Sequence, residues 1–443
     1  MSNLPQRGAF FKINASTRGA ESEPLLARHT VNPSNPINNV LMKENPMKEN
    51  TASQSGIFNR CTITLLVVYR LVRVLSLLAV VGFLSSPADA QFLYVNNNGT
   101  PNMISAFHFN SAGTLTPVPG SPFSTGGNGG LCFDIGSTRT IHPSGGRLYA
   151  TNSASGNVSG FNIANDGSLT PVPGSPFPMS AGGNPIGVAA SANGQFLFVG
   201  RGFFLSPFGA GIDVFQINAD GSLTLVPGSP FGVGGGAGFD VLFDARRKNV
   251  ISDVNNYEVS VFNAAKTGAL VPITGSPFTT PTANNHKMAL GSQGSCLFVA
   301  GGLASVSAMQ VARDGSLSNA PGSPVAATGQ TNVIGAATTQ QGNFAYFGGN
   351  NSIVGFSFDN RCSLTPIPGS PFISGGSFPA GVTTEGSGKF LFAVNAFSSS
   401  VSSFSIATNG SLTLIGTSPL QGTALCATGL VAYPVIVGPP ASR

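Results

Sequence analysis

Three residues with reactive or charged side chains, His286, Asp240 and Arg201, are the first candidates for chemistry in this sequence. A histidine beside a carboxylate can act as a general base, and an arginine can hold a carboxylate or another substrate oxygen. Asp, Glu, Lys and Arg make up only 8% of the 443-residue chain, so Asp240 and Arg201 close together with a histidine would be unusual. The alternative is that His286 and Asp240 are solvated loop residues or caps at strand starts.

Four further polar residues are expected close to these three, where their side chains would bind a ligand. They are Asp134, Asn184, Asn332 and Asn395. No spacing of His, Asp, Glu and Cys residues resembles a zinc site, and no D-x-D-x-D-G calcium loop occurs, so we expect neither a metal nor another cofactor. Residues 91–443 carry 12 Lys and Arg against 11 Asp and Glu, which makes this part of the chain nearly neutral. Nucleic-acid binding requires a basic face, and the sequence indicates none.

The elements that would position these residues are built from a repeated phrase. GSLTPVPGSPF at 167–177 is one of seven related copies, which lie at 113–123, 167–177, 221–231, 268–278, 315–325, 362–372 and 410–420. Four of the six spacings between successive copies are 47 or 48 residues, and the other two are 54. Self-similarity at this period is typical of an array of repeated structural units.

Each repeat contains four short runs of strand-forming residues separated by Gly, Asn and Asp turns. In the unit over 184–231 the runs lie at 184–190, 196–199, 212–217 and 223–226. This pattern predicts a four-stranded antiparallel meander. The fourth run contains prolines such as Pro171 and Pro173, which cannot donate to a ladder, so we place it at the outer edge.

Repeats of this kind close into a ring, and the fold class predicted is an all-β, seven-bladed β-propeller. The chain contains no Trp, so it is not a WD-repeat propeller. The run at 92–95 reads as a second strand with no first strand before it, and the run at 427–433 at the other end supplies the missing one. The C-terminal strand is therefore expected to close the ring.

The two longer repeats locate inserted residues, at 124–137 and at 201–211. Both insertions are expected on one face of the ring, around the axial mouth, where propellers usually bind ligands. Neutral drift in surface loops is the alternative explanation.

The first 90 residues are expected to lie outside the propeller. Residues 1–60 are polar and without periodicity, which indicates a disordered or mis-called N-terminal extension. Residues 61–90 combine a basic flank, an apolar run over 74–84 and an A-x-A ending, which is typical of a signal peptide.

Cleavage after Ala90 would give a secreted or periplasmic protein over 91–443 that is no longer attached to the membrane. The rival is an uncleaved anchor spanning 62–85, although Arg70 and Arg73 interrupt that span.

Four cysteines fall within the repeat region. Cys132 precedes the second blade and Cys426 precedes the closing strand, so these two are expected to be neighbours, and a disulfide between them would latch the ring shut. Unpaired buried thiols are the alternative. Cys296 and Cys362 are expected in adjacent blades but at different radii, so we do not expect them to pair.

Units that read roughly P-x-G-V…G-K-F-L-F-V-x-N…V-S-x-F…G-S-L resemble the lactonase-type propeller family, which includes 6-phosphogluconolactonases and a muconate-lactonising branch. The resemblance covers 91–443 and implies the family's fold. Activity in the family is associated with a G-P-R-H-like start of a first strand and an N-E-L-like end of a second. The positions compared here read GNPI at 183–186 and VNAF at 394–397, so only Asn395 matches.

Two functions follow as expectations. The first, implied by the resemblance, is an exported hydrolase that opens a sugar or small-molecule lactone at the axial mouth. The second is a non-catalytic propeller that binds a carbohydrate, a peptide or an envelope protein. In both cases we expect a monomer.

Overall fold

The computed structural model describes residues 91–130, 138–141, 146–180, 183–202, 210–234, 238, 240–254, 257–422, 424 and 426–433. The expected N-terminal extension over 1–60 and signal peptide over 61–90 lie outside these residues, as do Cys132 and Asp134. The chain divides into two compact units, and all the described residues belong to the unit over Gly82–Arg443. No helix in the described part of the chain is long and apolar enough to cross a membrane.

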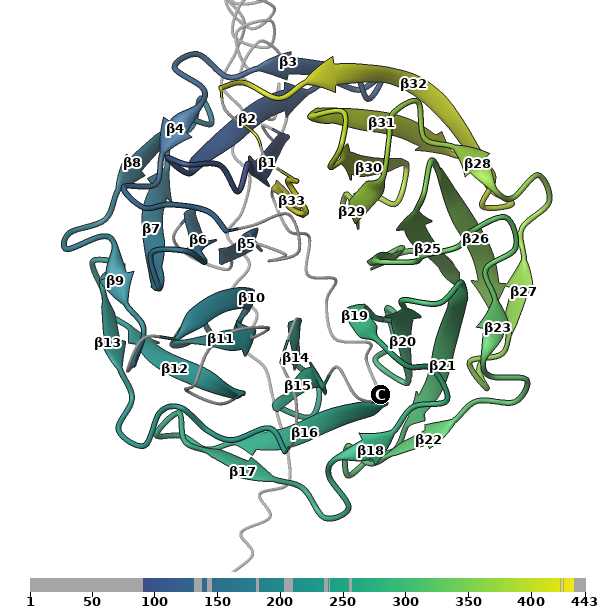
Figure 1. Cartoon of the computed structure of the whole chain (residues 1–443), viewed down its shortest axis with the longest axis horizontal. Helices are drawn as coiled ribbons and strands as arrows, with labels where there is room; N and C mark the ends of the chain where they lie inside the picture. Colours follow the sequence, from purple (N-terminus) through teal and green to yellow (C-terminus); the bar gives the residue numbers. More distant parts are fainter. Residues whose placement is uncertain are drawn as a thin grey trace, which may run out of the picture. The chain divides into compact units, whose positions relative to one another are not determined.

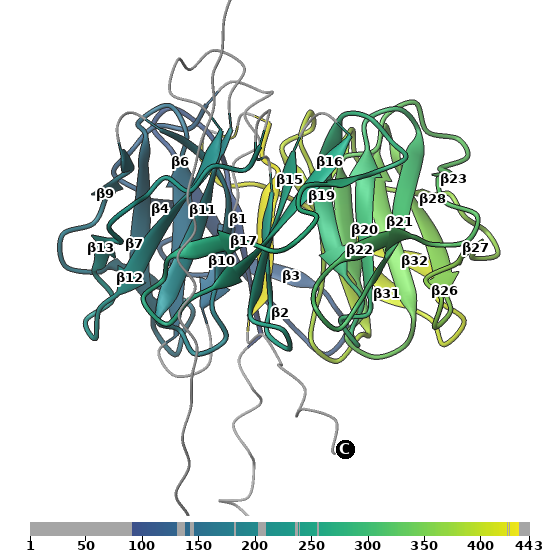
Figure 2. The same cartoon turned by 90° about the horizontal axis from the view of Figure 1, so that it is seen from below.

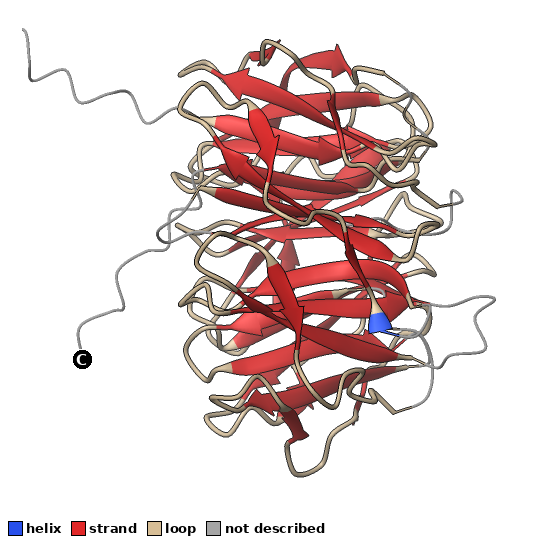
Figure 3. Cartoon of the chain, turned by 90° about the vertical axis from the view of Figure 1, so that its left-hand side faces the viewer, coloured by secondary structure: helices blue, strands red, loops and turns tan. Residues whose placement is uncertain are grey.

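The described residues form seven antiparallel sheets, arranged as blades around a central axis (Figures 1 and 2). Strands make up nearly all the regular structure of these residues (Figure 3). In six blades the chain runs from an innermost first strand outward to a fourth, and in five of the seven blades a short fifth strand returns to pair with the third.

The strands of each blade are as follows, from the axis outward. Blade 1 contains β33 (Gly429–Tyr433), β1 (Phe92–Asn96), β2 (Met103–Phe109), β3 (Leu115–Pro117) and β4 (Phe123–Ser124), and blade 2 contains β5 (Thr138–Ile141), β6 (Arg147–Asn152), β7 (Asn157–Ile163), β8 (Leu169–Pro171) and β9 (Phe177–Pro178). Blade 3 contains β10 (Asn184–Ala190), β11 (Phe196–Gly202), β12 (Gly211–Ile217) and β13 (Leu223–Leu225), and blade 4 contains β14 (Val241–Asp244), β15 (Asn249–Val254), β16 (Glu258–Ala264), β17 (Leu270–Pro272) and β18 (Phe278–Thr279). Blade 5 contains β19 (Asn285–Leu290), β20 (Cys296–Gly301), β21 (Ser305–Val311), β22 (Leu317–Asn319) and β23 (Val325–Ala326), and blade 6 contains β24 (Gly335–Thr338), β25 (Phe344–Gly349), β26 (Ser352–Phe358), β27 (Leu364–Pro366) and β28 (Phe372–Ile373). Blade 7 contains β29 (Pro379–Thr384), β30 (Phe390–Asn395), β31 (Ser400–Ile406) and β32 (Leu412–Pro419).

The predicted seven-bladed β-propeller is confirmed, and so is its closure by the C-terminal strand. β33 pairs antiparallel with β1, with Phe92 opposite Tyr433 and Asn96 opposite Gly429. The last segment of the chain thus supplies the innermost strand of the blade that the first segment begins (Figure 1).

The repeated phrase forms the outer edge of each blade, where its prolines were expected. In the copy at 167–177, the fourth strand pairs with only three residues of the third, ending at Pro171. The third strand still has amides to satisfy beyond that point. The hydroxyl of Ser175 accepts a hydrogen bond from the Gly160 amide at 3.0 Å, and the following Phe177 pairs with Val158. This short fifth strand is a feature that the sequence did not predict.

A turn between the third and fourth strands joins each blade to the preceding one. Gly167 in such a turn has φ +83°, and a Cβ placed on it would lie 2.4 Å from the ring of Phe92, the first residue of β1. The hydroxyl of Tyr94 donates to the Gly167 carbonyl at 2.9 Å. Glycine is required here by its positive φ and by the close approach of the ring. The six glycine joints are Gly113 on Phe390, Gly167 on Phe92, Gly221 on Arg147, Gly268 on Phe196, Gly315 on Asn249 and Gly410 on Phe344.

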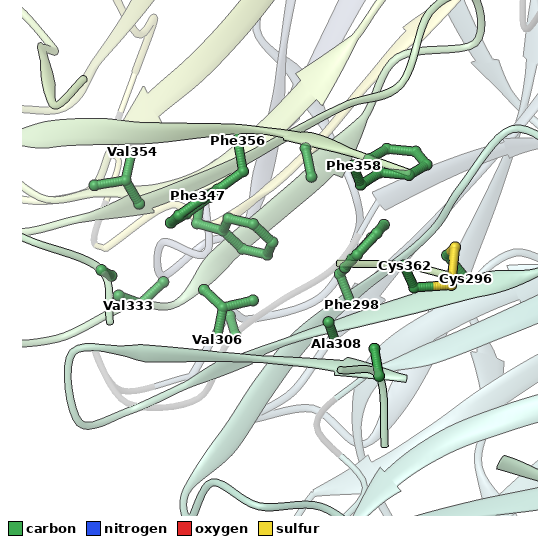
Figure 4. Packing of buried hydrophobic residues seen from close by; sticks show 14 residues of the cluster. Cys296, Phe298, Val306, Ala308, Val333, Phe347, Val354, Phe356, Phe358 and Cys362 are labelled. Carbon is green, nitrogen blue, oxygen red and sulfur yellow. A yellow bond between two sulfur atoms is a disulfide. The ribbon is translucent and has the colours of Figure 1, made fainter. Parts of the chain in front are cut away.

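At the seventh joint the glycine is replaced by Cys362 and its partner by Cys296, and the two form a disulfide (Figure 4). The expectation that they would not pair was therefore wrong. Cys362 has φ +66° in the turn after β26, and Cys296 is the first residue of β20. The turn of one blade reaches over the second strand of its neighbour, so the difference in radius that argued against the pair does not exist.

Candidate functional site

The predicted site residues that the structure describes lie at one face of the ring, which we call the mouth face. It is the face where the innermost strands begin and where the loops joining second to third strands lie. Arg201 is near the end of β11, Asp240 immediately precedes β14, and His286 is the second residue of β19. These positions fall in blades 3, 4 and 5, in the order of the ring (Figure 1).

The guanidinium of Arg201 is bound by two residues near it in the chain, Asp213 and Ser180. Its Nε lies 3.1 Å from Oδ2 of Asp213 on β12, and both side chains are buried. Its Nη2 also donates to the hydroxyl of Ser180 at 2.7 Å and to the carbonyl of the same residue. Among the described residues, the guanidinium therefore contacts Asp213 and Ser180 rather than Asp240 or His286. This buried ion pair fixes the end of β11.

Asp240 links blade 4 to blade 5. Its backbone amide donates to Oδ1 of Asp253, at the end of β15, at 2.5 Å. Its own carboxylate accepts a hydrogen bond from the Met288 amide at 3.0 Å, and its Oδ1 lies 4.0 Å from Nζ of Lys287. Asp240 and Asp253 are fully buried. Burying two carboxylates is favourable only when they are paired and hydrogen-bonded, and this network supplies the partners.

His286 and Lys287 lie in an irregular part of β19. Asn285 pairs with Gly301 and Met288 with Val299, so β19 has one more residue than β20 between these pairs. Such a β-bulge re-aims side chains and is common beside active sites. Here it contains the two basic residues, of which Lys287 faces Asp240 across the blade boundary.

Burial holds His286 in its neutral form. Its ring lies against Gly302, since a Cβ placed on that glycine would be 3.2 Å from Nε2. Burial lowers the pKa of His286 to about 4, and the positive charge of Lys287 contributes in the same direction. An imidazole in this environment is unprotonated at neutral pH and can accept a proton.

The expected ligand-binding asparagines occupy different environments. Asn184 opens β10, and Asn332 lies just before β24; both are partly buried at the mouth face. Asn395 is fully buried at the end of β30, where its Nδ2 donates to the hydroxyls of Ser400 and Ser402 at 3.1 and 2.8 Å. Asn395 therefore holds the second strand of blade 7 to the third.

Two expected site residues lie outside the described residues, namely Asp134 and Cys132. Cys426 is itself disulfide-bonded. The pairing of Cys132 with Cys426 stays a prediction.

Lys287 and Asp253 are candidate residues that the sequence pattern did not indicate. A first strand that begins with a basic pair does occur, as Asn285-His286-Lys287 in blade 5. In blade 4 an acidic residue, Asp253, lies one residue before the end of the second strand. The adjacent basic residues at the start of β19 are the sequence signal for Lys287.

The arrangement provides the groups that ester hydrolysis requires. A neutral imidazole at His286 can take a proton from water, and the ammonium of Lys287 can stabilise negative charge on a carbonyl oxygen. The carboxylates of Asp240 and Asp253 hold this segment in place through hydrogen bonds at 3.0 and 2.5 Å. In the described part of the chain, no group of three or more His, Cys, Asp and Glu residues could hold a metal ion.

Solved structures with the same fold include a periplasmic gluconolactonase from Pseudomonas aeruginosa, with 18% identity, a TM-score of 0.62 and coverage of 78% of this chain and 99% of that one. A proposed 6-phosphogluconolactonase from Bacteroides fragilis has 16% identity and a TM-score of 0.63, covering 79% of this chain and 99% of its own. A protein from Lactobacillus plantarum has 16% identity and a TM-score of 0.59, covering 77% and 99%. At these identities the likeness concerns the fold alone.

Sequence comparison gives a more specific result. A search of curated proteins found no significant match. The family model described as "Lactonase, 7-bladed beta-propeller" matches residues 136–428, which is more than half of the chain and includes His286, Lys287, Asp240 and Asp253. With its seven blades and closing strand, the chain belongs to the seven-bladed β-propeller lactonase family.

Proposed function

We propose that this protein is an exported hydrolase that opens a sugar or small-molecule lactone at the mouth face, with its centre at His286 and Lys287. The observation that carries the proposal is the basic pair in the β19 bulge, anchored to the buried carboxylates of Asp240 and Asp253. Family membership and the name of the Pseudomonas aeruginosa neighbour, a gluconolactonase, support a lactone as the substrate.

In the proposed reaction, His286 takes a proton from a water molecule whose oxygen bonds to the lactone carbonyl carbon. Lys287 stabilises the charge that develops on the carbonyl oxygen. The ring carbon–oxygen bond then breaks, and the leaving oxygen receives the proton from His286. The product is an open hydroxy acid, which releases one proton at neutral pH. Asp240 and Asp253 are positioning residues in this scheme, and Arg201 belongs to the framework.

Two observations support export. The chain contains a disulfide between Cys296 and Cys362, and Cys426 is disulfide-bonded as well. Disulfides form and persist in oxidising compartments such as the periplasm and the extracellular space. The signal-like segment over 61–90 supports the same localisation.

The test is lactone hydrolysis by the purified protein, followed as proton release at pH 7 after subtraction of spontaneous hydrolysis. The panel contains gluconolactone, its 6-phosphate and several acyl lactones. We expect His286→Ala to lose roughly 10²–10⁴-fold in kcat/KM. Lys287→Met should lose on the order of 10²–10³-fold, because it removes charge stabilisation in the transition state.

Matched controls come from the outer surface of the ring. His108 on β2 and Lys266 after β16 are exposed and lie away from the mouth face, so His108→Ala and Lys266→Met should retain wild-type turnover. Absence of turnover on every lactone would reject the hydrolase proposal for these substrates and favour a non-catalytic binding propeller. Turnover that survives in His286→Ala would reject the proposed centre.

A further inference from the structure

Large apolar side chains are exposed on the mouth face in three loops. They are Tyr257, Leu303 and Phe397, which are 53%, 66% and 61% exposed and lie in the loops joining second to third strands of blades 4, 5 and 7. The remaining exposed large apolar residues within the described part of the chain are Leu225, Val271, Ile373 and Leu414, on outer-edge strands. Exposed aromatic residues around a propeller mouth are candidates for ligand contact.

Phe397 differs from the other two because it is part of a rigid pair of rings. It stacks on Phe378, with ring centroids 4.5 Å apart and ring planes 10° from parallel. The Phe397 amide donates to the Ser377 carbonyl at 3.2 Å, and the Ala396 amide donates to the Phe378 carbonyl at 2.8 Å. The stacked pair is therefore held by backbone bonds on both sides. We call Phe378 and Phe397 the aromatic platform.

Phe378 has an unusual backbone conformation, with φ +60°. A bulky residue rarely adopts this conformation, and such outliers cluster at functional sites because the surroundings must hold them in place. Here the Phe378 amide donates to the Asn350 carbonyl of blade 6 at 2.5 Å. The ring also packs against the buried apolar cluster that includes Ile334 and Ala380, where β24 and β29 begin. The platform thus lies beside the innermost strands, at the junction of blades 6 and 7.

The surroundings of the platform are polar but uncharged. The side chains of Thr331 and Asn350 hydrogen-bond to each other, and the hydroxyl of Ser398 accepts a bond from the Ser377 amide at 3.0 Å. Thr331 and Ser398 are exposed. The segments 326–335, 347–353, 374–381 and 394–402, which supply these groups, contain no Asp, Glu, Lys, Arg or His.

We propose that the aromatic platform is a binding subsite for a neutral sugar ring of an oligosaccharide or polysaccharide. A pyranose ring presents an apolar face of C–H groups that stacks on an aromatic ring, and its hydroxyls form hydrogen bonds with surrounding amides and hydroxyls. An ionic ligand would require charged partners, which these segments lack. The subsite belongs to blades 6 and 7, whereas the hydrolytic centre proposed above belongs to blades 4 and 5, so each can exist without the other.

The absence of tryptophan from the chain allows a direct test with the full-length protein. The variant Phe397→Trp keeps a stacking ring and introduces the only indole, so its fluorescence reports on the platform. We expect cellohexaose, xylohexaose or chitohexaose to change its emission in a saturable way. Leu303→Trp, at the corresponding position of blade 5, is the matched control and should not respond.

A second measurement uses the loss of the ring. Phe397→Ala should bind insoluble cellulose, xylan or chitin about tenfold more weakly than the wild type, because aromatic stacking is removed. Leu303→Ala should bind as the wild type does. The proposal is overturned if none of the three sugars changes the emission of Phe397→Trp, or if Phe397→Ala keeps wild-type binding. A response to an apolar peptide alone would assign the platform to a protein partner instead.

Discussion

At the scale of single residues, two neighbours in one strand have opposite environments. Nζ of Lys287 lies 4.0 Å from Oδ1 of the buried Asp240, which stabilises the ammonium charge, whereas burial lowers the pKa of His286 to about 4 and so favours its neutral imidazole. Both residues lie in the bulge of β19, which re-aims their side chains relative to those of a regular strand. The result is a neutral base next to a cation, the combination that the proposed hydrolysis requires.

The pH dependence of activity should reflect the lowered pKa of His286. Because the neutral imidazole is the active form, kcat/KM should stay level as the pH falls below 6.5 and should decline only near pH 4. Removing the nearby positive charge in Lys287→Met should move the pKa of His286 upward. An NMR titration of the ring, assigned with His286→Ala, measures this shift independently of turnover. A pKa near 6.5 in the wild type would contradict the prediction.

The lowered pKa of His286 also makes the stability of the folded protein depend on pH. The unfolded chain binds a proton at His286 below about pH 6.5, whereas the folded protein excludes it until about pH 4. The contribution of His286 to stability is therefore lost progressively as the pH falls through that window.

At the scale of the element, the repeated phrase is explained residue by residue. Its leading glycine turns the chain with a positive φ and contacts the preceding blade, as Gly167 does on Phe92. Its leucine is buried, its proline lies at the outer edge, and its later serine accepts a bond from the third strand, as Ser175 does. The phrase recurs because each blade needs the same joint and the same edge.

Two glycine substitutions should separate two contributions to the free energy of unfolding. One comes from the left-handed backbone conformation, and the other from the close contact between blades. Gly322 has φ +77° and open space around it, so Gly322→Ala should cost about 1–2 kcal/mol for the left-handed conformation alone. Gly167→Ala should cost roughly 1–3 kcal/mol more, because its methyl group would collide with the Phe92 ring. Denaturant unfolding measures both, and equal losses would show that the contact with Phe92 contributes nothing.

At the scale of the whole molecule, the described core is divided among the joints between blades. One buried cluster, for example, combines Phe298 of blade 5 with Phe347 of blade 6 (Figure 4). Stability of the ring therefore depends on neighbouring blades staying in contact, as in other repeat proteins. The pairing of β33 with β1 makes the ring continuous through backbone hydrogen bonds between the two ends of the chain.

The disulfide between Cys296 and Cys362 allows a test of whether contacts between neighbouring blades determine the stability of the ring. Cys296 and Cys362 are separated by 66 residues, so replacing both with Ser should lower the free energy of unfolding by about 4 kcal/mol in the chain-entropy model. Cys296→Phe combined with Cys362→Gly restores the pair found at four other joints, and it should recover part of that loss. Thermal unfolding with and without reductant provides the comparison. If the Phe–Gly pair is no more stable than the Ser pair, the seven joints are not equivalent.

The sequence alone determined the blade count, the strand order within a blade and the closure by residues 427–433. Those features depend on the period of apolar runs and on the position of proline, which are local properties of the chain. Tertiary structure alone decided which side chains meet. Cys296 meets Cys362 because a turn reaches over the neighbouring blade, Arg201 is engaged by Asp213, and Lys287 faces Asp240 because β19 is bulged. Contacts between blades join residues far apart in sequence, and a register shift of one residue changes the direction of a side chain, so neither can be read from the repeat pattern.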